Sequence, residues 1–286
     1  MWTTATIDDL RRRRAAMEKV GGPVALVPTM GALHDGHVSL IRAAREQAKH
    51  VIVSIFVNPT QFGPSEDFTR YPRPIHDDLS RCEQAGADGV FQPDPAEMYP
   101  PDAPPSDLDL PTRTGELEGA ARPGHFRGVC RVVLKLFNIV QPHLALFGMK
   151  DYQQLRVVDA MVRDLNVPVR VVPCPTLREP DGLAMSSRNI YLSAEQRRRA
   201  VGLHKALQQA RQLIEQGETD PAAVEHAMRQ VITAHQFDSI DYAVVRHPQT
   251  LGRLDCLEPA VTGGVVALAA ARLGATRLLD NLVVGG

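Results

Sequence analysis

The sequence predicts an α/β fold, with a Rossmann-like parallel sheet that carries helices on both faces and a smaller C-terminal α+β domain with an antiparallel sheet. Over the first two thirds of the 286 residues, short apolar runs alternate with segments of helical periodicity. Near-continuous apolar strands separated by helices are typical of a parallel sheet covered on both faces. After residue 176, helices are followed by adjacent strands, which is typical of an α+β unit. We therefore expect two domains, 1–176 and 177–286.

The first domain is expected to contain strands and helices in alternation. The apolar runs predict strands at 23–27, 51–57, 89–92, 144–148 and 169–172. Helical periodicity predicts helices at 36–48, 75–85, 129–140 and 152–165. Proline and acidic residues dominate 92–111, so a loop or mobile flap is expected there.

The second domain is expected to begin with helices. Ser193 and Gln196 form a capping-box pattern that opens a long helix ending near Gly217, and a second helix is expected at 221–235. Strand-like runs follow at 241–246, 264–271 and 276–281. This order favours an antiparallel sheet.

Composition and charge indicate an ordinary globular protein. Hydrophobic residues make up 44% and charged residues 23% of the chain. The formal net charge of −1 gives no electrostatic argument for binding nucleic acid or an anionic membrane. The basic run at 11–14 follows a capping-box pattern at 6–9, so we expect one solvated turn of helix.

The four cysteines, Cys82, Cys130, Cys174 and Cys256, are widely scattered and include no Cys-x-x-Cys pair. This distribution argues against a zinc site or a disulfide framework and suits a reducing compartment. The sequence shows neither a signal segment nor an apolar stretch long enough to cross a bilayer. The expected location is the cytoplasm, with no membrane partner.

The most informative motif, Leu-His-Asp-Gly-His at 33–37, lies between an expected strand and an expected helix. A helix start binds anions through unpaired N–H groups and a partial positive charge. Gly36 lets the backbone approach a ligand, and His34 and His37 can donate hydrogen bonds to phosphate oxygens. The pattern predicts chemistry on a nucleoside triphosphate. Two surface histidines, or half of a metal site, are the alternatives, although no other Cys or His pair completes such a site.

A second motif lies near the expected domain boundary, at 182–189. Ser186, Ser187 and Arg188 combine hydroxyl donors with a guanidinium fork, which is a suitable arrangement for phosphate. Alone, this string is ordinary loop composition. Paired with His-x-Gly-His, it is similar to motifs of class I aminoacyl-tRNA synthetases and related nucleotidyltransferases. In addition, Asn58 and Lys150 lie just past strand ends, where ligands of parallel sheets bind.

Longer blocks of the chain resemble the pantoate–β-alanine ligase family. They occur in the order of that family, at 28–37, 57–62, 70–73, 122–128, 146–155 and 181–189. Met149 departs from the pattern, because the family usually has glutamate between the residues matching Gly148 and Lys150. We expect this change to alter phosphate affinity only slightly.

The resemblance implies a ligase that works in two steps. The carboxylate of (R)-pantoate attacks the α-phosphate of ATP, giving pantoyl adenylate and pyrophosphate. The amine of β-alanine then attacks the acyl carbon, and AMP leaves. The implied partners are therefore the small molecules pantoate, β-alanine and ATP, with Mg²⁺ bridging the triphosphate, and the protein is expected to be a homodimer. Asp77 or Asp78 could assist Mg²⁺ through the nucleotide, or be merely exposed acids of a helix; no direct metal ligand is assigned.

The same resemblance implies the residues of the site. The catalytic set is His34, His37, Lys150, Ser186, Ser187 and Arg188. The ATP-binding set is Met30, Gly31, Ala32, Leu33, His34, Asp35, Gly36, His37, Gly148, Met149, Lys150, Asp151, Leu177, Met185, Ser186, Ser187 and Arg188. The family names the position of His37 as a proton donor. We interpret it as a stabiliser of transition-state charge, because attack by a carboxylate on phosphorus needs no general acid.

Individual roles follow from the same match. Asp151 would accept hydrogen bonds from the ribose, and Leu177 would contact adenine through its backbone. Gln61 and Gln154 match the pantoate-binding glutamines, whereas spacing alone would favour ordinary surface glutamines. His125 and Arg127 match a mobile segment of the family near the substrate and are given no firm role.

Other functions predict different features. A cytidylyl- or adenylyltransferase that leaves the nucleotide on its product would lack the paired glutamines and the Asn-Pro-Thr-Gln-Phe block at 58–62. A tRNA synthetase is disfavoured, because no anticodon-binding domain or basic face is evident. A non-catalytic nucleotide-binding protein would not need intact phosphate-binding motifs. A further hypothesis is that the C-terminal domain closes over ATP as a lid; unchanged protease sensitivity of the 185–188 loop on adding ATP would count against it.

Overall fold

The computed structural model describes residues 1–64, 66–103, 108, 115–257 and 264–285. The chain divides into two compact units. Unit 1 contains residues 1–148 and 157–175, and unit 2 contains residues 149–156 and 176–286. The short segment 149–156 thus groups with the C-terminal part of the chain.

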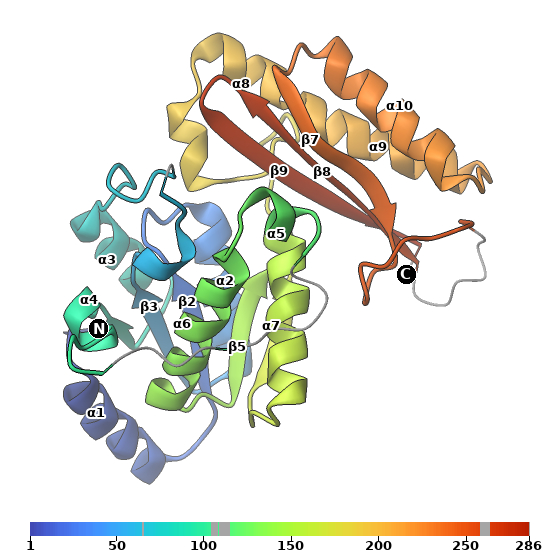
Figure 1. The fold of residues 1–286 in the computed structure, drawn as a ribbon. Helices are drawn as coiled ribbons and strands as arrows, with labels where there is room; N and C mark the ends of the chain where they lie inside the picture. Colours follow the sequence, from blue (N-terminus) through green and yellow to red (C-terminus); the bar gives the residue numbers. More distant parts are fainter. Residues whose placement is uncertain (65, 104–107, 109–114, 258–263, 286) are drawn as a thin grey trace. The chain divides into compact units, whose positions relative to one another are not determined.

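Unit 1 is built on a six-stranded sheet whose described pairs are all parallel. The strand order is β1-β4-β3-β2-β5-β6 (Figure 1). The strands are β1 (Trp2–Thr4), β2 (Val24–Thr29), β3 (His50–Ile55), β4 (Gly89–Phe91), β5 (Leu144–Gly148) and β6 (Arg170–Cys174). The predicted Rossmann-like sheet is confirmed, and β1 is an addition that the sequence did not predict. This strand has only three residues, too few to show a periodicity.

The helices of unit 1 connect these strands. They are α1 (Ile7–Val20), α2 (Asp35–Gln47), α3 (Ile75–Gln84), α4 (Pro95–Met98), α5 (Glu118–Ala121) and α6 (His125–Val140), with a 3₁₀ turn η1 (Pro59–Gln61). Right-handed crossovers place α2 and α3 on one face of the sheet and α1 and α6 on the other. Helix α7 (Tyr152–Asp164) begins in unit 2 and continues in unit 1.

Two local expectations for unit 1 need correction. The segment 92–111 is not loop throughout, because α4 lies within it; residues 104–107 and 109–111 fall outside the described residues. The basic run at 11–14 is not wholly solvated. The Arg14 side chain is buried and donates to the carbonyl oxygens of Val140 and Gln141. It thereby pairs carbonyl groups at the C-terminal end of α6 that the helix itself leaves without donors.

Unit 2 combines helices with a three-stranded sheet. The 3₁₀ turns are η2 (Met149–Asp151) and η3 (Ser187–Tyr191), and the helices are α8 (Ala194–Ala200), α9 (Gly202–Glu215) and α10 (Pro221–Ala234). The strands β7 (Ser239–Arg246), β8 (Val265–Leu273) and β9 (Thr276–Val284) pair antiparallel in that order. The predicted α+β arrangement with an antiparallel sheet is confirmed.

The single long helix expected from Ser193 to Gly217 is wrong. It is divided into α8 and α9, and Val201 lies between them. The next residue, Gly202, lies so close to His235 that an added Cβ would be 2.5 Å from the His235 Cβ. Close packing against the end of α10 therefore accompanies the break, and the sequence does not reveal such a long-range contact.

Across the described part of the chain, no helix combines the length and the apolarity that crossing a membrane requires.

Candidate functional site

The first candidate cluster lies at the carboxyl ends of the unit 1 strands. From β2 the chain passes through α2 to β3 on one side, while β5 pairs with β2 on the other side. The strand order thus reverses between β2 and β5, and ligands of open α/β sheets bind at such a switch point. The His-x-Gly-His segment follows β2, and Gly148 is the last residue of β5.

The loop after β2 is held by a buried carboxylate. Gly31 and Ala32 both have positive φ angles, of 81° and 50°. Asp78 of α3 accepts hydrogen bonds from the backbone N–H groups of Ala32 (2.9 Å) and Leu33 (2.7 Å). An added Cβ at Gly31 would lie 2.9 Å from the Asp78 carboxylate, so a glycine suits this close approach. Burial raises the pKa of Asp78, and the two N–H donors oppose that rise.

This arrangement separates the two acids that were considered for magnesium. Both oxygens of Asp78 accept backbone hydrogen bonds of the loop, whereas Asp77 is exposed on α3. Asp78 is therefore engaged in shaping the loop that leads to the histidines. Within the residues described, no group of three or more His, Cys, Asp or Glu side chains is arranged to hold a metal ion.

The two histidines are oriented by the start of α2. His34 is the N-cap residue, and its Nδ1 accepts from the N–H of Gly36 at 3.2 Å. The Nδ1 of His37 accepts in return from the N–H of His34, also at 3.2 Å. Because each Nδ1 acts as an acceptor, each neutral ring carries its hydrogen on Nε2. The ring centroids lie 4.1 Å apart, so the sequence motif becomes a pair of adjacent Nε2–H donors at a helix N-terminus.

Asp35, which lies between the histidines in sequence, is exposed. It forms an ion pair with Arg81 of α3 at 3.0 Å. Its carboxylate thus contacts a cation of unit 1.

Gln61 is buried and oriented by Asn58. The Nδ2 of Asn58 donates to the Gln61 side-chain oxygen (3.0 Å), while its Oδ1 accepts from the Tyr99 hydroxyl (2.8 Å). These bonds determine the orientation of the Gln61 amide, whose NH₂ group faces the Met30 sulfur at 3.2 Å. Asn58 was expected just past a strand end without a role, and Tyr99 was not predicted.

The backbone of Gln61 is fixed by a second group. His125 Nδ1 donates to the Gln61 carbonyl (2.9 Å), and Arg122 hydrogen-bonds His125 Nε2 (3.0 Å). Arg122 also forms a two-pronged ion pair with Glu66, at 2.7 and 2.6 Å. Burial, together with the Arg122 charge, lowers the pKa of His125 to about 4. Although burial acts to raise the pKa of Glu66, the hydrogen bonds and charge of Arg122 lower it overall.

His125 is therefore a buried neutral anchor for the segment that carries Gln61, while Arg127 is exposed on α6. Glu66 and the function of Arg122 were not predicted. The only sequence signal was the position of Arg122 and His125 in one family-like block, since nothing local links them to Glu66.

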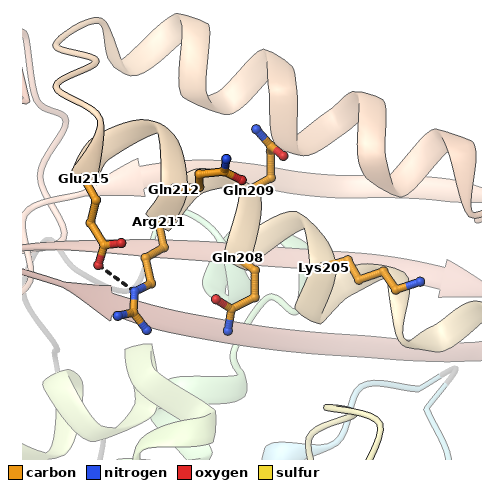
Figure 2. A pocket seen from close by; sticks show the side chains of 6 residues that line it. All are labelled: Lys205, Gln208, Gln209, Arg211, Gln212 and Glu215. Carbon is orange, nitrogen blue, oxygen red and sulfur yellow. Dashed lines mark hydrogen bonds and ion pairs between the residues drawn. The ribbon is translucent and has the colours of Figure 1, made fainter.

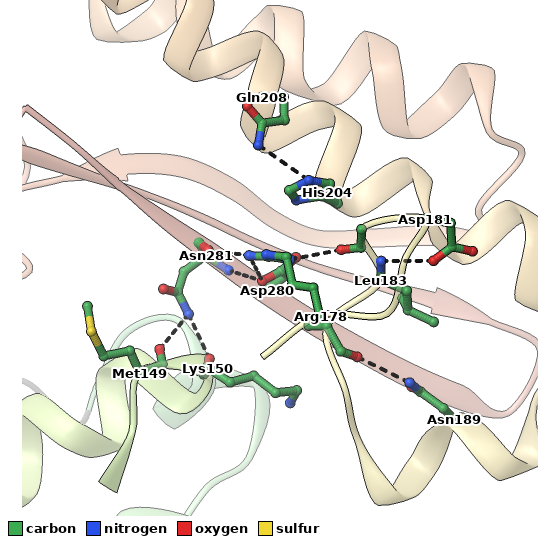
Figure 3. Close-up of polar contacts among 12 residues, drawn as sticks. Met149, Lys150, Arg178, Asp181, Leu183, Asn189, His204, Gln208, Asp280 and Asn281 are labelled. Carbon is green, nitrogen blue, oxygen red and sulfur yellow. Dashed lines mark hydrogen bonds and ion pairs between the residues drawn. The ribbon is translucent and has the colours of Figure 1, made fainter. Parts of the chain in front are cut away.

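The second candidate cluster belongs to unit 2. Lys150 lies in η2, and its Nζ is 3.7 Å from the Asp151 carboxylate. The carbonyl oxygens of Met149 and Lys150 both accept from Asn281 of β9 (Figure 3). Gln154 follows on the first turns of α7 and is half-buried.

The remaining candidates lie on a short hairpin and the turn after it. Arg178 and Ala184 form an isolated antiparallel bridge, and Met185 N–H donates to the Leu177 carbonyl at 3.0 Å. Ser186 is the N-cap of η3, where its hydroxyl accepts from the N–H of Arg188. The hairpin thus delivers Met185 directly into the Ser-Ser-Arg turn. Leu177 is exposed, at 40%.

Unit 2 also has a surface hollow of about 390 Å³ that contains none of the predicted site residues. It is lined by side chains of α9 alone (Figure 2), namely Lys205, Gln208, Gln209, Arg211, Gln212 and Glu215. Arg211 and Glu215 form an ion pair one helical turn apart. The hollow is therefore a feature of a polar helix surface and is separate from the predicted site residues.

Comparison with known proteins shows which proteins the whole chain is similar to. The family model described as pantoate-beta-alanine ligase matches residues 3–283. A pantothenate synthetase of Roseiflexus castenholzii is 51% identical, with 99% of each chain covered. The structure of pantothenate synthetase from Thermus thermophilus is similar at 45% identity, with a TM-score of 0.93 and complete coverage of both chains. A Francisella tularensis pantoate-beta-alanine ligase, complexed with beta-gamma ATP and beta-alanine, is 31% identical, with a TM-score of 0.82 and coverage of 99% of this chain and 97% of that one.

Proposed function

The chain belongs to the pantoate–β-alanine ligase family, and as such it is an ATP-dependent ligase of pantothenate biosynthesis. We propose that it forms pantothenate through a pantoyl adenylate, using the two clusters described above. The observation that carries this proposal is the pair of oriented Nε2–H donors at the start of α2, within a chain that matches the family from residue 3 to 283.

His34 and His37 stabilise charge on the phosphates in this mechanism. Their Nδ1 atoms accept backbone hydrogen bonds, which orients both Nε2–H groups without further rearrangement. As the pantoate carboxylate attacks the α-phosphorus, negative charge grows on the oxygens that leave with pyrophosphate. Donors that are already oriented stabilise that charge at little reorganisation cost. The remaining ATP contacts in unit 1 come from the loop 30–37 and from Gly148.

Gln61 holds pantoate. Its carbonyl end is occupied by Asn58, so its NH₂ group is the end that offers donors to a carboxylate or hydroxyl. Gln154 is the second pantoate residue, contributed by α7. In this assignment Asn58 and His125 orient Gln61, and Gln61 in turn orients pantoate.

In unit 2, Lys150, Ser186, Ser187 and Arg188 bind the β- and γ-phosphates. The set combines an ammonium and a guanidinium group with two hydroxyl donors, which suits an anion that becomes a leaving group. Asp151 accepts from the ribose hydroxyls, and the Leu177 backbone contacts adenine. Met149 contributes through its main chain, whose carbonyl is held by Asn281.

Mg²⁺ is included in the proposal as a companion of ATP. The ion would be held mainly by triphosphate oxygens and water. A homodimer in the cytoplasm completes the proposal.

The test is a reaction in two stages. Purified protein is mixed with ATP, Mg²⁺ and pantoate, and enzyme-bound adenylate and pyrophosphate are followed; β-alanine is then added. The proposal predicts pyrophosphate only when pantoate is present, then AMP and pantothenate after the amine is added. ATP binding without pantoate-dependent pyrophosphate would contradict the ligase. A product that keeps the nucleotide after β-alanine is added would indicate a nucleotidyltransferase.

A further inference from the structure

Two adjacent residues of β9, Asp280 and Asn281, contact both segments of unit 2 that carry the proposed phosphate-binding residues. Each is only 4% exposed. They lie in a strand whose neighbouring positions are mostly apolar, where a buried carboxylate and a buried amide need specific partners. Figure 3 shows these partners, with Met149 and Lys150 bonded to Asn281 and Arg178 bonded to Asp280.

Asn281 holds the segment of Lys150. Its Nδ2 donates to the Met149 carbonyl at 2.9 Å and to the Lys150 carbonyl at 2.7 Å. These carbonyls belong to the 3₁₀ turn η2. A single turn leaves most of its backbone groups without partners inside the turn, so both donors come from a side chain distant in sequence. The Lys150 side chain extends away from this amide (Figure 3).

Asp280 holds the hairpin that leads to the Ser-Ser-Arg turn. Its two oxygens accept from Arg178 at 2.6 and 3.0 Å, in a fork-to-fork ion pair. Arg178 in turn donates to the Gly182 carbonyl at 3.1 Å, which closes the hairpin. Asp280 is 3% exposed in its side chain, so this pair is shielded from water.

The two arms are coupled through the backbone of β9. Asp280 Oδ1 accepts from the N–H of Asn281 (2.8 Å), and Arg178 donates to the Asn281 carbonyl (3.1 Å). A shift of either residue would therefore move both segments. An apolar residue at 281 would leave the carbonyls of Met149 and Lys150 without these donors.

We propose that Asp280 and Asn281 are positioning residues, which set the Lys150 turn and the Met185–Arg188 turn in one fixed relation for binding the phosphates of ATP. This inference rests on the phosphate-binding role of those turns under the proposed function. Asn281 acts on Lys150 through the main chain, and Asp280 acts on the Ser-Ser-Arg turn through Arg178. Neither side chain is assigned a contact with substrate.

The decisive experiment is a double-mutant cycle between Asn281→Ala and Lys150→Ala. The dissociation constant of ATP with Mg²⁺ and the rate of pantoate-dependent pyrophosphate release are measured for all four proteins. Asn281→Ala alone is expected to raise the dissociation constant and to lower the rate, each by ~10- to ~10²-fold, because a small misplacement of a charged group greatly slows a reaction. In the Lys150→Ala background, Asn281→Ala should change each quantity by less than about twofold, because the Lys150 ammonium group that it would misplace is absent.

Glu225→Ala is the matched control for stability. Glu225 accepts from the Val245 N–H and from Arg246, so its loss removes partly buried contacts of unit 2 elsewhere. It should lower the melting temperature as Asn281→Ala does, with ATP affinity and pyrophosphate release unchanged. Equal losses of affinity in both variants, or multiplicative losses in the cycle, would overturn the positioning role.

Asn281→Asp sharpens the test, because it keeps the shape but replaces both donors with acceptors. It is expected to be at least as impaired as Asn281→Ala; activity near the unchanged protein would contradict the proposal. The contact of Asp280 with Arg178 is tested in the same way. Asp280→Asn is expected to change ATP affinity much less in the Arg188→Ala background, and full additivity there would contradict the positioning role of Asp280.

Different results would refute the proposed function and the positioning role. An unchanged protein that releases no pantoate-dependent pyrophosphate would refute the proposed function. The cycle on ATP affinity would still decide whether Asn281 positions Lys150. Conversely, an active ligase with additive losses would refute the positioning role alone.

Discussion

The two candidate clusters are held in place in different ways. In unit 1 the side chains of the proposed site are themselves part of the local structure: His34 and His37 cap α2, and Gln61 is fixed by Asn58. In unit 2, apart from Ser186, whose hydroxyl accepts from the Arg188 N–H, the contacts that hold the segments go largely to the main chain. Asn281 binds the carbonyl of Lys150, and Arg178 binds the carbonyl of Gly182.

Because of this difference, function and stability should be linked in unit 1 and largely independent in unit 2. Where a side chain both caps a helix and binds substrate, its removal should affect folding and activity together. Where other residues hold the backbone, a reactive side chain can be removed with little effect on folding. The four predictions that follow test this contrast, beginning with the largest effect.

The largest effect is expected at His37. His37→Glu keeps an acceptor for the His34 N–H, as glutamate does at this position of a capping box, but has no hydrogen-bond donor. Its rate of adenylate formation should fall by ~10²–10³ with the melting temperature unchanged. His37→Ala should lose the same activity and, in addition, about 1 kcal/mol of stability through the lost cap. Equal stability of the two variants would contradict the double role of His37.

The next effect is a pH dependence of stability from His125. Burial and the Arg122 charge lower its pKa to about 4 in the folded protein, from 6.5 in the unfolded chain. Between these pH values the unfolded chain binds more protons than the folded protein. The contribution of neutral His125 to the free energy of unfolding is therefore fully present above pH 6.5 and decreases as the pH falls toward 4. The loss should approach ~3 kcal/mol, at 1.36 kcal/mol per unit.

Urea unfolding from pH 8 to pH 4 measures this loss. His125→Gln cannot titrate, so its stability should decrease less steeply than that of the unchanged protein, and the two curves should converge at low pH. Parallel curves would show that His125 is not the buried neutral anchor of unit 1.

Asp78→Asn tests the loop before the histidines. The amide NH₂ would face one of the two N–H groups of Ala32 and Leu33, leaving it without an acceptor in a buried position. The expected cost is about 1–3 kcal/mol of stability. A weaker affinity for ATP should accompany it, because the loop leads into the histidine pair. Asp77→Asn, exposed on the same helix, is the control and should change neither quantity.

The smallest effect on stability is expected at Lys150. Its side chain is 21% exposed, and its pairing partner Asp151 is half-exposed, so the pair is screened by solvent. Because Asn281 holds the backbone, Lys150→Met should change the free energy of unfolding by less than about 0.5 kcal/mol, although adenylation becomes much slower. A large loss of stability would remove the contrast between the units.

The sequence predicted what depends on local pattern. Apolar runs and helical periodicity were sufficient for most strands and helices, and His34 and His37 were placed correctly at a helix start. Family-like blocks added Gln61, Lys150 and the Ser-Ser-Arg turn, whose roles remain predictions.

What the sequence did not predict depends on long-range contact. Asp78, Glu66 and Asn281 each act on a segment far away in the chain, and nothing beside them in sequence marks their partners. The burial of Arg14 and the break before Gly202 have the same origin, since each depends on a neighbour brought close by folding. The short strand β1 was missed because pairing with β4 defines it, whereas its own pattern does not.

The most direct test of the mechanism follows one oxygen atom. Pantoate labelled with ¹⁸O in its carboxylate is converted with ATP and β-alanine, and the products are separated and analysed by mass spectrometry. If the carboxylate attacks the α-phosphorus, one labelled oxygen leaves with AMP when the amine attacks the acyl carbon. A pantoyl adenylate predicts ¹⁸O in AMP and none in pyrophosphate; AMP without label, or label in a released phosphate, would contradict it.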